Sequence, residues 1–395
     1  MEHSKIAILG STGSVGRQAL DALSAIKHTT VLLTGGGNIS LLADQARITK
    51  AERVAVPTES AASELKTLLS DTDTKVYGGK TAICDCIAEC GADLIVHSIS
   101  GMAGISSAIA ASKTGARLAI ANKESIISLG DEIYKNIRAF NGELIPVDSE
   151  HSAIFQCLCT SGAIDSRGNS KPELVKRILL TASGGPFFGK TRIDLEKVTP
   201  QMALAHPTWR MGQKITIDCA TLMNKGFEVI EAVRLFKVDI EKVEVLIHRQ
   251  SIIHSMVEYI DTMVMAQLGT PDMRHCVRYA LTYPDRMKVN EPGLDFASIE
   301  KLSFDRPDNN AFPLLDLSYK AYRMGGNAPA ALISADEAAV KAFIGGKLSF
   351  NGISDVVTDT LEKFSVSSEC TVESVFCAER EAGRIAGELI NARAS

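Results

Sequence analysis

The feature that most constrains the fold is an alternation of short apolar runs with longer amphipathic stretches between residue 5 and about residue 147. The apolar runs are Ile6–Leu9, Val31–Leu33, Val54–Val56, Leu94–His97, Leu118–Ala121 and Leu144–Val147. Stretches with helical spacing, such as Gly16–Ile26 and Ile39–Arg47, lie between them. Strands that alternate with helices pair in parallel, because right-handed crossovers return each strand beside an earlier one. The N-terminal part is therefore predicted to be a parallel sheet covered by helices.

The pattern becomes less regular after residue 147. Further strands are predicted at Ile178–Thr181, Lys214–Asp218, Val243–Ile247, Ser255–Tyr259 and Met263–Leu268, the last three antiparallel, with a helix at Asn224–Phe236. From Pro313 onward the spacing is helical, as in Ala330–Phe343 and Val372–Asn391. We therefore predict an α/β protein in three parts: a parallel sheet at 1–147, an α+β domain at 148–286 and, after a polar linker at 287–312, a helical bundle at 313–395.

Composition excludes several classes of protein. The 395 residues carry 42 basic and 47 acidic side chains without a basic block, so no nucleic-acid partner is expected. No apolar run reaches the roughly 18 residues that a membrane span needs. There is no signal-peptide pattern, which favours a cytoplasmic location and reduced thiols for the nine cysteines. Cys84, Cys86 and Cys90 lack zinc-site spacing and are predicted to be ordinary buried helix positions.

A glycine turn follows the first predicted strand. Gly10, Gly13 and Gly16 lie between that strand and the first predicted helix, with the spacing G-x-x-G-x-x-G. Glycines allow a tight turn and close approach of the backbone to a pyrophosphate, which the free N–H groups of the helix start stabilise. This context favours dinucleotide binding by a Rossmann-like domain over a plain glycine turn.

The end of the second predicted strand bears on the choice between NAD and NADP. An acidic residue there would bind the ribose 2′-hydroxyl group of NAD. Here the sequence after Val31–Leu33 is Thr-Gly-Gly-Gly-Asn, ending at Asn38, and it contains no carboxylate. A 2′-phosphate therefore has room, although no Lys or Arg stands beside it, and NADP is favoured over NAD.

Acidic and basic side chains with suitable spacing suggest a cation site and an anion site. Asp148 and Glu150 follow a strand two residues apart, so both can lie on one side of extended chain; the alternative is a solvated loop. Asn224, Lys225 and Glu228 share one face at a helix start, although Asn224 could be a cap and Lys225 a solvated charge. Together, the three carboxylates would form an all-oxygen site suited to Mg²⁺ or Mn²⁺.

Three further segments have both a functional and a structural interpretation. Ser183-Gly-Gly-Pro follows a strand and offers N–H groups to an anion, or is a turn without a ligand. The segment His206–Gly212 contains the only tryptophan and is either a lid that excludes water or a packed loop. Ala121–Ser125 places charged side chains directly after an apolar strand, where open α/β sheets bind ligands, which favours a functional interpretation.

Taken in order, the motifs of this chain resemble those of the 1-deoxy-D-xylulose-5-phosphate reductoisomerase family along essentially the whole sequence. The matching stretches are GSTGSVG, ANKES, PVDSEHSAIFQ, SGGPF, HPTWRMG, CATLMNKGFEVIEA, EVLIHRQSIIHSMV and AQLGTPDMR. The resemblance implies a homodimer with an NADP-binding domain, a catalytic domain that carries the dimer contacts, and a C-terminal helical domain. It also implies reductive rearrangement of 1-deoxy-D-xylulose 5-phosphate to 2-C-methyl-D-erythritol 4-phosphate in non-mevalonate isoprenoid synthesis.

The resemblance assigns roles to individual residues. It implies NADPH contacts at Thr12, Gly13, Ser14, Val15, Gly36, Gly37, Asn38, Asn122, Glu124 and Gly212. It implies metal ligands at Asp148, Glu150 and Glu228, for Mn²⁺ or Mg²⁺ with Co²⁺ as a further candidate. It implies substrate contacts at Lys123, Ser149, Glu150, Ser183, His206, Trp209, Met211, Cys219, Asn224, Lys225 and Glu228, of which Trp209 and Met211 belong to a closing flap. Lys123 and Glu150 are candidates for proton transfer, as is a metal-bound water.

Two positions depart from the family pattern. Gly37 stands where relatives often have a basic residue near the 2′-phosphate, and Cys219 stands where a serine usually faces the substrate phosphate. Two other functions remain as alternatives. A different NADP-dependent aldehyde oxidoreductase would not require a cation, and a non-catalytic NADPH-binding regulatory protein would bind the cofactor without turnover.

Overall fold

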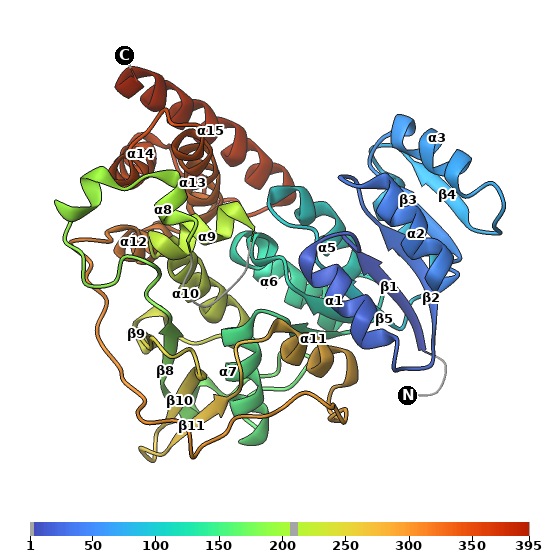
Figure 1. Cartoon of the computed structure of the whole chain (residues 1–395), viewed down its shortest axis with the longest axis horizontal. Coiled ribbons are helices and arrows are strands. Elements are labelled where there is room, and N and C mark those ends of the chain that lie inside the picture. Colours follow the sequence, from blue (N-terminus) through green and yellow to red (C-terminus); the bar gives the residue numbers. More distant parts are fainter. Residues whose placement is uncertain (1–3, 206–211, 395) are drawn as a thin grey trace. The chain divides into compact units, whose positions relative to one another are not determined.

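The computed structural model of the chain describes residues 4–205 and 212–394 (Figure 1). The chain forms two compact units. The first unit contains Met1–Ile126, Gly130–Ser170 and Asp272–Pro292, and the second contains Ile127–Leu129, Lys171–Pro271 and Gly293–Ser395. The three-part division with boundaries near residues 147, 286 and 312 remains a prediction.

The first unit is built on a seven-stranded sheet, of which β1 to β5 are labelled in Figure 1. Its strands are β1 Ser4–Leu9, β2 His28–Thr34, β3 Arg53–Val56, β4 Lys75–Gly78, β5 Leu94–His97, β6 Arg117–Ile120 and β7 Glu143–Pro146. All neighbouring strands are parallel, in the order β4-β3-β2-β1-β5-β6-β7. The predicted parallel sheet is therefore confirmed, with one addition: β4 was not predicted, because it is short and only partly buried.

Helices cover both faces of this sheet. They are α1 Ser14–Leu23, α2 Ile39–Thr49, α3 Glu59–Leu68, α4 Ala82–Glu89, α5 Ile105–Ser112, α6 Lys123–Ala139, α7 Ser149–Thr160 and α11 Met273–Thr282. Right-handed crossovers place α1–α3 on one face and α4–α6 on the other, and the contacts of α2 with α3 and of α4 with α5 agree. The strand order reverses between β1 and β5, which is the point at which open parallel sheets bind ligands.

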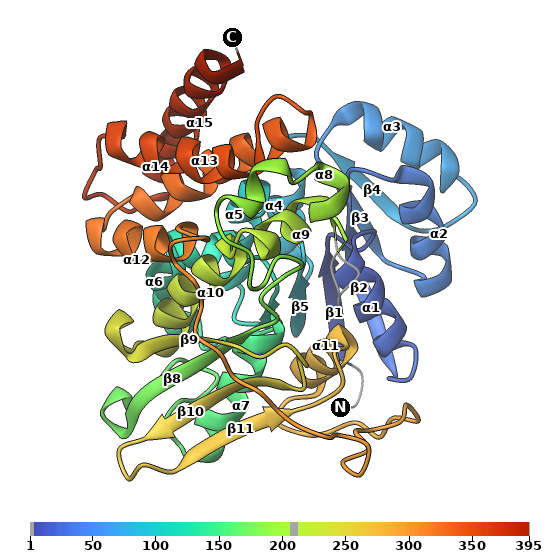
Figure 2. The same cartoon turned by 60° about the vertical axis from the view of Figure 1, so that its left-hand side comes forward.

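The second unit contains a four-stranded sheet and most of the C-terminal helices (Figure 2). Its strands are β8 Val175–Ala182, β9 Val243–Ile247, β10 Ile253–Tyr259 and β11 Val264–Leu268, in the order β11-β10-β8-β9. Its helices are α8 Pro200–Ala203, α9 Gln213–Ala220, α10 Met223–Phe236, α12 Leu314–Met324, α13 Ala328–Ile344, α14 Phe350–Lys363 and α15 Val372–Ala394. Helix α13 packs against α9, α12, α14 and α15 and is largely buried, so the predicted helical bundle is confirmed.

Two predictions for the second unit were wrong in detail. Lys214–Asp218 belongs to helix α9, not to a strand. Its polar and apolar residues alternate like those of a strand, but Lys214 and Asp218 lie one helical turn apart and form an ion pair of 2.6 Å, and Lys214 also contacts Asp336 of α13 at 2.6 Å. Strand β9 runs parallel to β8, because a long connection that includes helix α10 joins the two strands.

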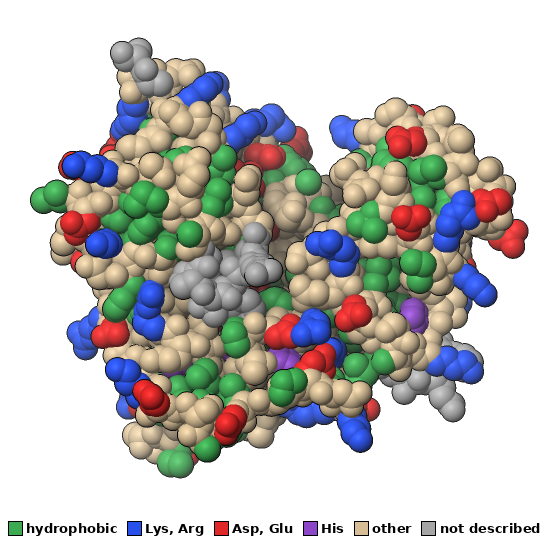
Figure 3. Space-filling model, in the orientation of Figure 1, with side chains coloured by type: hydrophobic (Ala, Val, Ile, Leu, Met, Phe, Trp, Pro, Cys, Tyr) green, Lys and Arg blue, Asp and Glu red, His purple; other side chains and the backbone are tan. Residues whose placement is uncertain are grey.

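Three features that the composition addressed can be followed in the structure: the distribution of charged side chains, the hydrophobicity of the helices and the positions of three cysteines. On the face drawn in Figure 3, basic and acidic side chains are interspersed. Among the described residues, no helix combines the length and the hydrophobicity that crossing a bilayer would require. Cys84 and Cys86 lie on α4 and Cys90 ends that helix; Cys86 and Cys90 are buried as predicted, whereas Cys84 is only partly buried.

Candidate functional site

The glycine turn has the geometry that its sequence predicts. Gly10 has a φ of +81°, a left-handed conformation that favours glycine. A Cβ atom on Gly16 would lie 2.3 Å from the carbonyl oxygen of Gly10, so a side chain cannot be accommodated there. Gly13 is the N-cap of α1 and provides no side chain to satisfy the N–H groups of the first turn. The turn therefore presents backbone donors at the carboxyl end of β1, as a pyrophosphate requires.

The end of β2 lies next to this turn. Gly36, Gly37 and Asn38 are exposed there, and the Asn38 side chain caps α2 by accepting the N–H of Leu41 at 2.9 Å. A Cβ atom on the preceding glycine, Gly35, would lie 3.3 Å from Oγ1 of Thr12, which belongs to the glycine turn. The residues predicted to contact the adenosine end of the cofactor are thus brought together.

A segment that the sequence did not single out completes this edge of the sheet. Ser98, directly after β5, donates its hydroxyl hydrogen to the carbonyl oxygen of Leu9 at 2.8 Å. Asn122 is 2% exposed and donates to the carbonyl oxygen of Gly101 at 3.0 Å and to Glu124 at 2.8 Å. Residues 98–101 therefore lie between the glycine turn and the predicted cofactor contact Asn122. The sequence feature that could have pointed to this segment is the Ser- and Gly-rich stretch directly after the apolar strand Leu94–His97.

His97 contacts, from within the core, the residues that follow this segment. Its side chain is fully buried, and its Nε2 atom lies 3.1 Å from the carbonyl oxygen of Gly104 and 2.8 Å from the hydroxyl oxygen of Ser107. Burial lowers the pKa of His97 from 6.5 to about 4, and the hydrogen bonds to backbone carbonyls only partly offset this effect. The imidazole is therefore neutral at pH 7.

His97 should make the stability of the protein pH-dependent. Its pKa is lower in the folded state, so its stabilising contribution is complete above pH 6.5 and is lost as the pH falls toward 4. Relative to His97→Gln, which retains a donor but does not titrate, the wild-type free energy of unfolding should fall by about 3 kcal/mol over this interval. Urea unfolding of both proteins between pH 7 and pH 4 measures the difference. Parallel curves would contradict the assignment.

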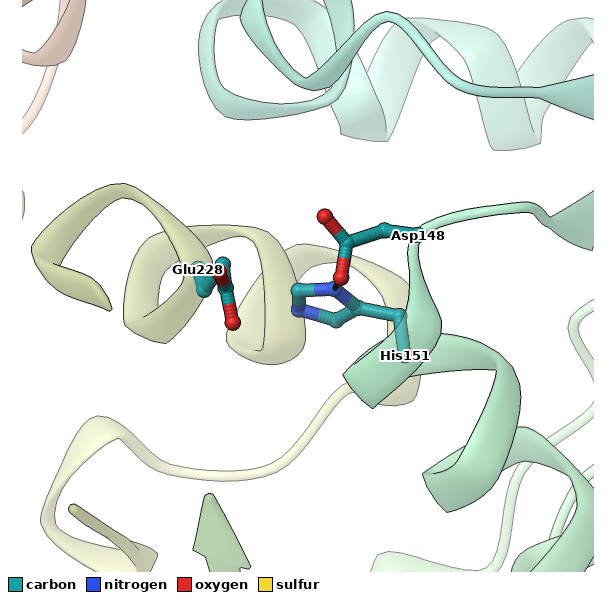
Figure 4. Close-up of side chains that lie close together, drawn as sticks. All are labelled: Asp148, His151 and Glu228. Atoms are coloured by element: carbon teal, nitrogen blue, oxygen red, sulfur yellow. Dashed lines mark hydrogen bonds and ion pairs between the residues drawn. The ribbon is translucent and has the colours of Figure 1, made fainter. Parts of the chain in front are cut away.

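Asp148 lies at the junction of β7 and α7, with a basic side chain on each side. The Nζ atom of Lys123 is 3.3 Å from its Oδ2 atom. The Nδ1 atom of His151 is 3.1 Å from the Oδ1 atom of Asp148, a contact drawn in Figure 4. Lys123 and His151 are buried. Lys123 and Asp148, both predicted site residues, are therefore in contact. His151 was not singled out from the sequence, because a single histidine on a helix carries no distinctive spacing.

Glu150 and Asp148 both raise the pKa of one buried thiol, that of Cys276. The hydroxyl group of Ser149 donates to the Glu150 carboxylate. Cys276 of α11 is buried, and its pKa is raised to about 12, first by burial and then by the negative charges of Asp148 and Glu150. The extended geometry expected for these two carboxylates is absent, because Asp148 is the N-cap of α7 and Glu150 lies in the first turn of that helix. Their use as ligands of one cation stays a prediction.

The predicted helical face of α10 is present in the second unit. The Asn224 amide donates to Oε1 of Glu228 at 2.5 Å, and Nζ of Lys225 donates to Oε2 of Glu228 at 2.6 Å. Lys225 also donates to the carbonyl oxygen of Thr181, at the end of β8, at 2.6 Å. Glu228 is 1% exposed and extends from α10 in Figure 4. A buried amide, ammonium group and carboxylate on one helical turn can bind a phosphate beside a cation.

The Ser183 loop lies directly after β8. Gly184 and Gly185 have φ angles of +76° and +64°, and a Cβ atom on Gly185 would lie 2.7 Å from the carbonyl oxygen of Cys219 on α9. Ser183 and Cys219 thus belong to neighbouring segments of one unit. Arg249, which donates to two carbonyl groups of this loop, was not singled out from the sequence.

The predicted flap is only partly described. His206, Trp209 and Met211 lie outside the described residues. Gly212 is exposed and is the N-cap of α9, and its carbonyl oxygen accepts the hydroxyl hydrogen of Thr216 at 2.8 Å.

The fold and the site define a class: an α/β protein with a dinucleotide-binding sheet edge and a separate cluster suited to a phosphorylated ligand. Three family models match the chain. They describe 1-deoxy-D-xylulose 5-phosphate reductoisomerase at residues 6–130, its C-terminal domain at residues 144–236, and the DXP reductoisomerase C-terminal domain at residues 268–385. The chain belongs to the 1-deoxy-D-xylulose 5-phosphate reductoisomerase family.

Individual relatives agree over nearly the full length. The 1-deoxy-D-xylulose 5-phosphate reductoisomerase of Lachnospira eligens is 43% identical, covering 95% of this chain and 97% of the relative. The Zymomonas mobilis enzyme, solved with NADPH, is 37% identical with a TM-score of 0.91, covering 98% of this chain and 99% of the other. A DOX-P reductoisomerase solved with NADPH, fosmidomycin and magnesium is 32% identical with a TM-score of 0.89, covering 98% of each chain. The resemblance seen in the sequence motifs is confirmed.

Proposed function

We propose that this chain uses NADPH and a divalent cation to convert 1-deoxy-D-xylulose 5-phosphate into 2-C-methyl-D-erythritol 4-phosphate, a step of isoprenoid synthesis. The observation that carries the proposal is the buried cluster of Asn224, Lys225 and Glu228 in a chain of this family. Burial of an amide, an ammonium group and a carboxylate costs solvation free energy, which a bound phosphate and cation would offset.

The cofactor would lie along the sheet edge of the first unit. The N–H groups near Gly13, Ser14 and Val15 suit the pyrophosphate, the exposed end of β2 suits the 2′-phosphate, and the pair of Asn122 and Glu124 suits the nicotinamide half. NADPH would supply the hydride that reduces the rearranged aldehyde.

The cation would be held by Asp148, Glu150 and Glu228. The set consists of carboxylate oxygens, which are the ligands that Mg²⁺ and Mn²⁺ prefer. When bound, the cation supplies Lewis acidity at the substrate carbonyl group. Lys123 and His151 contact the Asp148 carboxylate and hold it in place. Lys123, Glu150 and a metal-bound water are the candidates to move a proton.

The substrate phosphate would be bound in the second unit. Ser183, Asn224 and Lys225 supply a hydroxyl group, an amide and a positive charge, while the Cys219 thiol is a weak donor. Lys123, Ser149 and His206 would contact the rest of the substrate, with Trp209 and Met211 as the flap. Phosphate contacts far from the reacting carbons supply binding free energy that can orient those carbons.

A homodimer and a cytoplasmic location belong to the same proposal. Strand β11 is the edge of its sheet; its first residue, Val264, is 48% exposed, and Ile260 and Met263 in the turn before it are 61% and 66% exposed. An exposed apolar edge strand is a surface that a second copy could cover. Sedimentation analysis of the full chain would detect the dimer.

Identification of the product tests the proposed function. Incubation with 1-deoxy-D-xylulose 5-phosphate, NADPH and Mn²⁺ should give a branched polyol phosphate with a methyl group on a quaternary carbon, visible by carbon NMR. An unrearranged, merely reduced sugar phosphate would instead indicate a simple carbonyl reductase.

Gly37 is expected to limit the preference for NADPH. A Cβ atom there would meet nothing within 4 Å, and its φ lies outside the left-handed region, so a side chain can be added without strain. Gly37→Arg should pair a guanidinium group with the 2′-phosphate and widen the ratio of kcat/KM for NADPH over NADH by about tenfold. Gly293→Arg, at another open position, is the control. An unchanged ratio in Gly37→Arg would place the 2′-phosphate elsewhere.

A further inference from the structure

Arg249 is fixed beside the Ser183 loop by the pairing of two strands. The N–H group of His248, directly after β9, donates to the carbonyl oxygen of Ala182 at 2.7 Å, so the ends of β8 and β9 lie together. Arg249 follows at once, and its NH1 group donates to the carbonyl oxygens of Ser183 at 3.1 Å and Gly185 at 2.8 Å. One guanidinium group thus holds both ends of the three-residue loop.

The charge of Arg249 has no carboxylate partner. Among residues 4–205 and 212–394, no carboxylate lies within ion-pair distance of this guanidinium group, whereas Arg177 in the same unit pairs with both Glu244 and Glu258. The other neighbour of Arg249 is the ring of Phe188, whose centroid is 5.2 Å from the guanidinium carbon. An aromatic ring orients a cation but does not neutralise it. A positive charge therefore remains available at this loop.

The hydrogen bonds of Arg249 to the two carbonyl oxygens also determine which backbone groups of the loop can bind an anion. In a planar trans peptide unit the C=O and N–H groups point in opposite directions. When Arg249 holds the carbonyl oxygen of Ser183, the N–H of Gly184 points away from the guanidinium group. The carbonyl oxygens of Ser183 and Gly185, which carry partial negative charge, point toward Arg249 and are thereby kept from facing a phosphate. Lys225 acts similarly two residues earlier, on the carbonyl oxygen of Thr181.

We propose that Arg249 is a positioning residue for phosphate binding, which orients the Ser183 loop and adds an unneutralised positive charge to the phosphate subsite. The inference rests on the proposed function, because that function assigns the substrate phosphate to Ser183, Asn224 and Lys225. We expect the role of Arg249 to be larger in this chain because Cys219, a weak donor, stands where the family resemblance implies a serine.

The test compares three variants of the full-length enzyme with NADPH and Mn²⁺ present. Arg249→Met keeps the length of the side chain but removes the donors and the charge, and Arg249→Lys keeps the charge. Arg323→Met is the matched control. Arg323 also stacks on an aromatic ring, that of Tyr319, and it donates a hydrogen bond to the side chain of Glu241. None of these partners belongs to the Ser183 loop.

Arg249→Met should raise the KM for 1-deoxy-D-xylulose 5-phosphate and the inhibition constant of inorganic phosphate by about tenfold each, with kcat within about twofold of wild type. Arg249→Lys should fall between wild type and Arg249→Met, and Arg323→Met should match wild type. A general loss of structure would lower kcat or affect the control equally.

The inference is overturned if Arg249→Met leaves both constants within about twofold of wild type, or if Arg323→Met changes them as much. If Arg249→Met does not fold, Arg249→Lys decides alone. A severalfold rise in both constants with kcat retained supports the positioning role, whereas unchanged constants, or a loss of kcat without a change in KM, refute it. A wild-type enzyme that does not turn over this substrate would refute the proposed function instead.

Discussion

Replacement of Glu228 by glutamine is expected to lower kcat/KM by at least about 1000-fold, a loss of roughly 4 kcal/mol of transition-state stabilisation. Glutamine preserves the shape of the side chain, but it removes the negative charge that Asn224 and Lys225 contact at 2.5 and 2.6 Å. It also removes one of the three carboxylates proposed to hold the cation. The loss should appear mainly in kcat, since the cation would act on the reacting carbonyl group.

Binding of NADPH separates this loss from general damage. The proposed cofactor contacts near Gly13 and Asn122 lie in the first unit, so a fluorescence titration of NADPH should give Glu228→Gln the affinity of wild type. Glu241→Gln, which alters an exposed ion pair with Arg323, is the control and should retain full turnover. A Glu228→Gln enzyme with more than about a tenth of the wild-type kcat/KM would exclude Glu228 as a ligand of the essential cation.

The second large effect is expected for Lys225→Met. Lys225 is 5% exposed, and its Nζ atom contacts Glu228 and the carbonyl oxygen of Thr181, both at 2.6 Å. Removal of the ammonium group leaves a buried carboxylate without its cation, which typically costs ~3–5 kcal/mol of stability. It also removes the charge proposed to bind the substrate phosphate. The KM for 1-deoxy-D-xylulose 5-phosphate should rise at least about 100-fold.

Thermal unfolding and steady-state kinetics measure the two consequences of Lys225→Met separately. Addition of Mn²⁺ should restore part of the lost stability, because a cation bound to Glu228 replaces the missing positive charge. Lys176→Met, at a half-exposed ion pair with Glu258, should change neither quantity appreciably. A KM for Lys225→Met within about threefold of wild type would remove Lys225 from the phosphate subsite.

Local sequence patterns were sufficient for most of the fold. The glycine turn and the alternation of apolar runs with helices predict the first sheet, because a parallel strand is recognised by its own hydrophobicity and its flanking turns. The shared face of Asn224, Lys225 and Glu228 was likewise predictable, because helical spacing alone brings these residues together. The resemblance to a family then supplied roles that spacing could not.

The errors arose where tertiary contacts decide the outcome. Lys214–Asp218 has the alternation of a strand, but its helix is favoured by contacts with Asp336, which lies more than 100 residues away in the chain. His151 and Arg249 were missed for the same reason. Their roles depend on a carboxylate and on loop carbonyls that only the folded chain places beside them.

The measurement that tests the central claim most directly is NADPH oxidation by enzyme freed of metal with a chelator. On addition of 1-deoxy-D-xylulose 5-phosphate, absorbance at the NADPH band should remain constant, and addition of Mn²⁺ should then start its loss, with one NADPH consumed per substrate. Oxidation that proceeds equally well without the cation would contradict the account, as would the absence of any oxidation when substrate, NADPH and Mn²⁺ are all present.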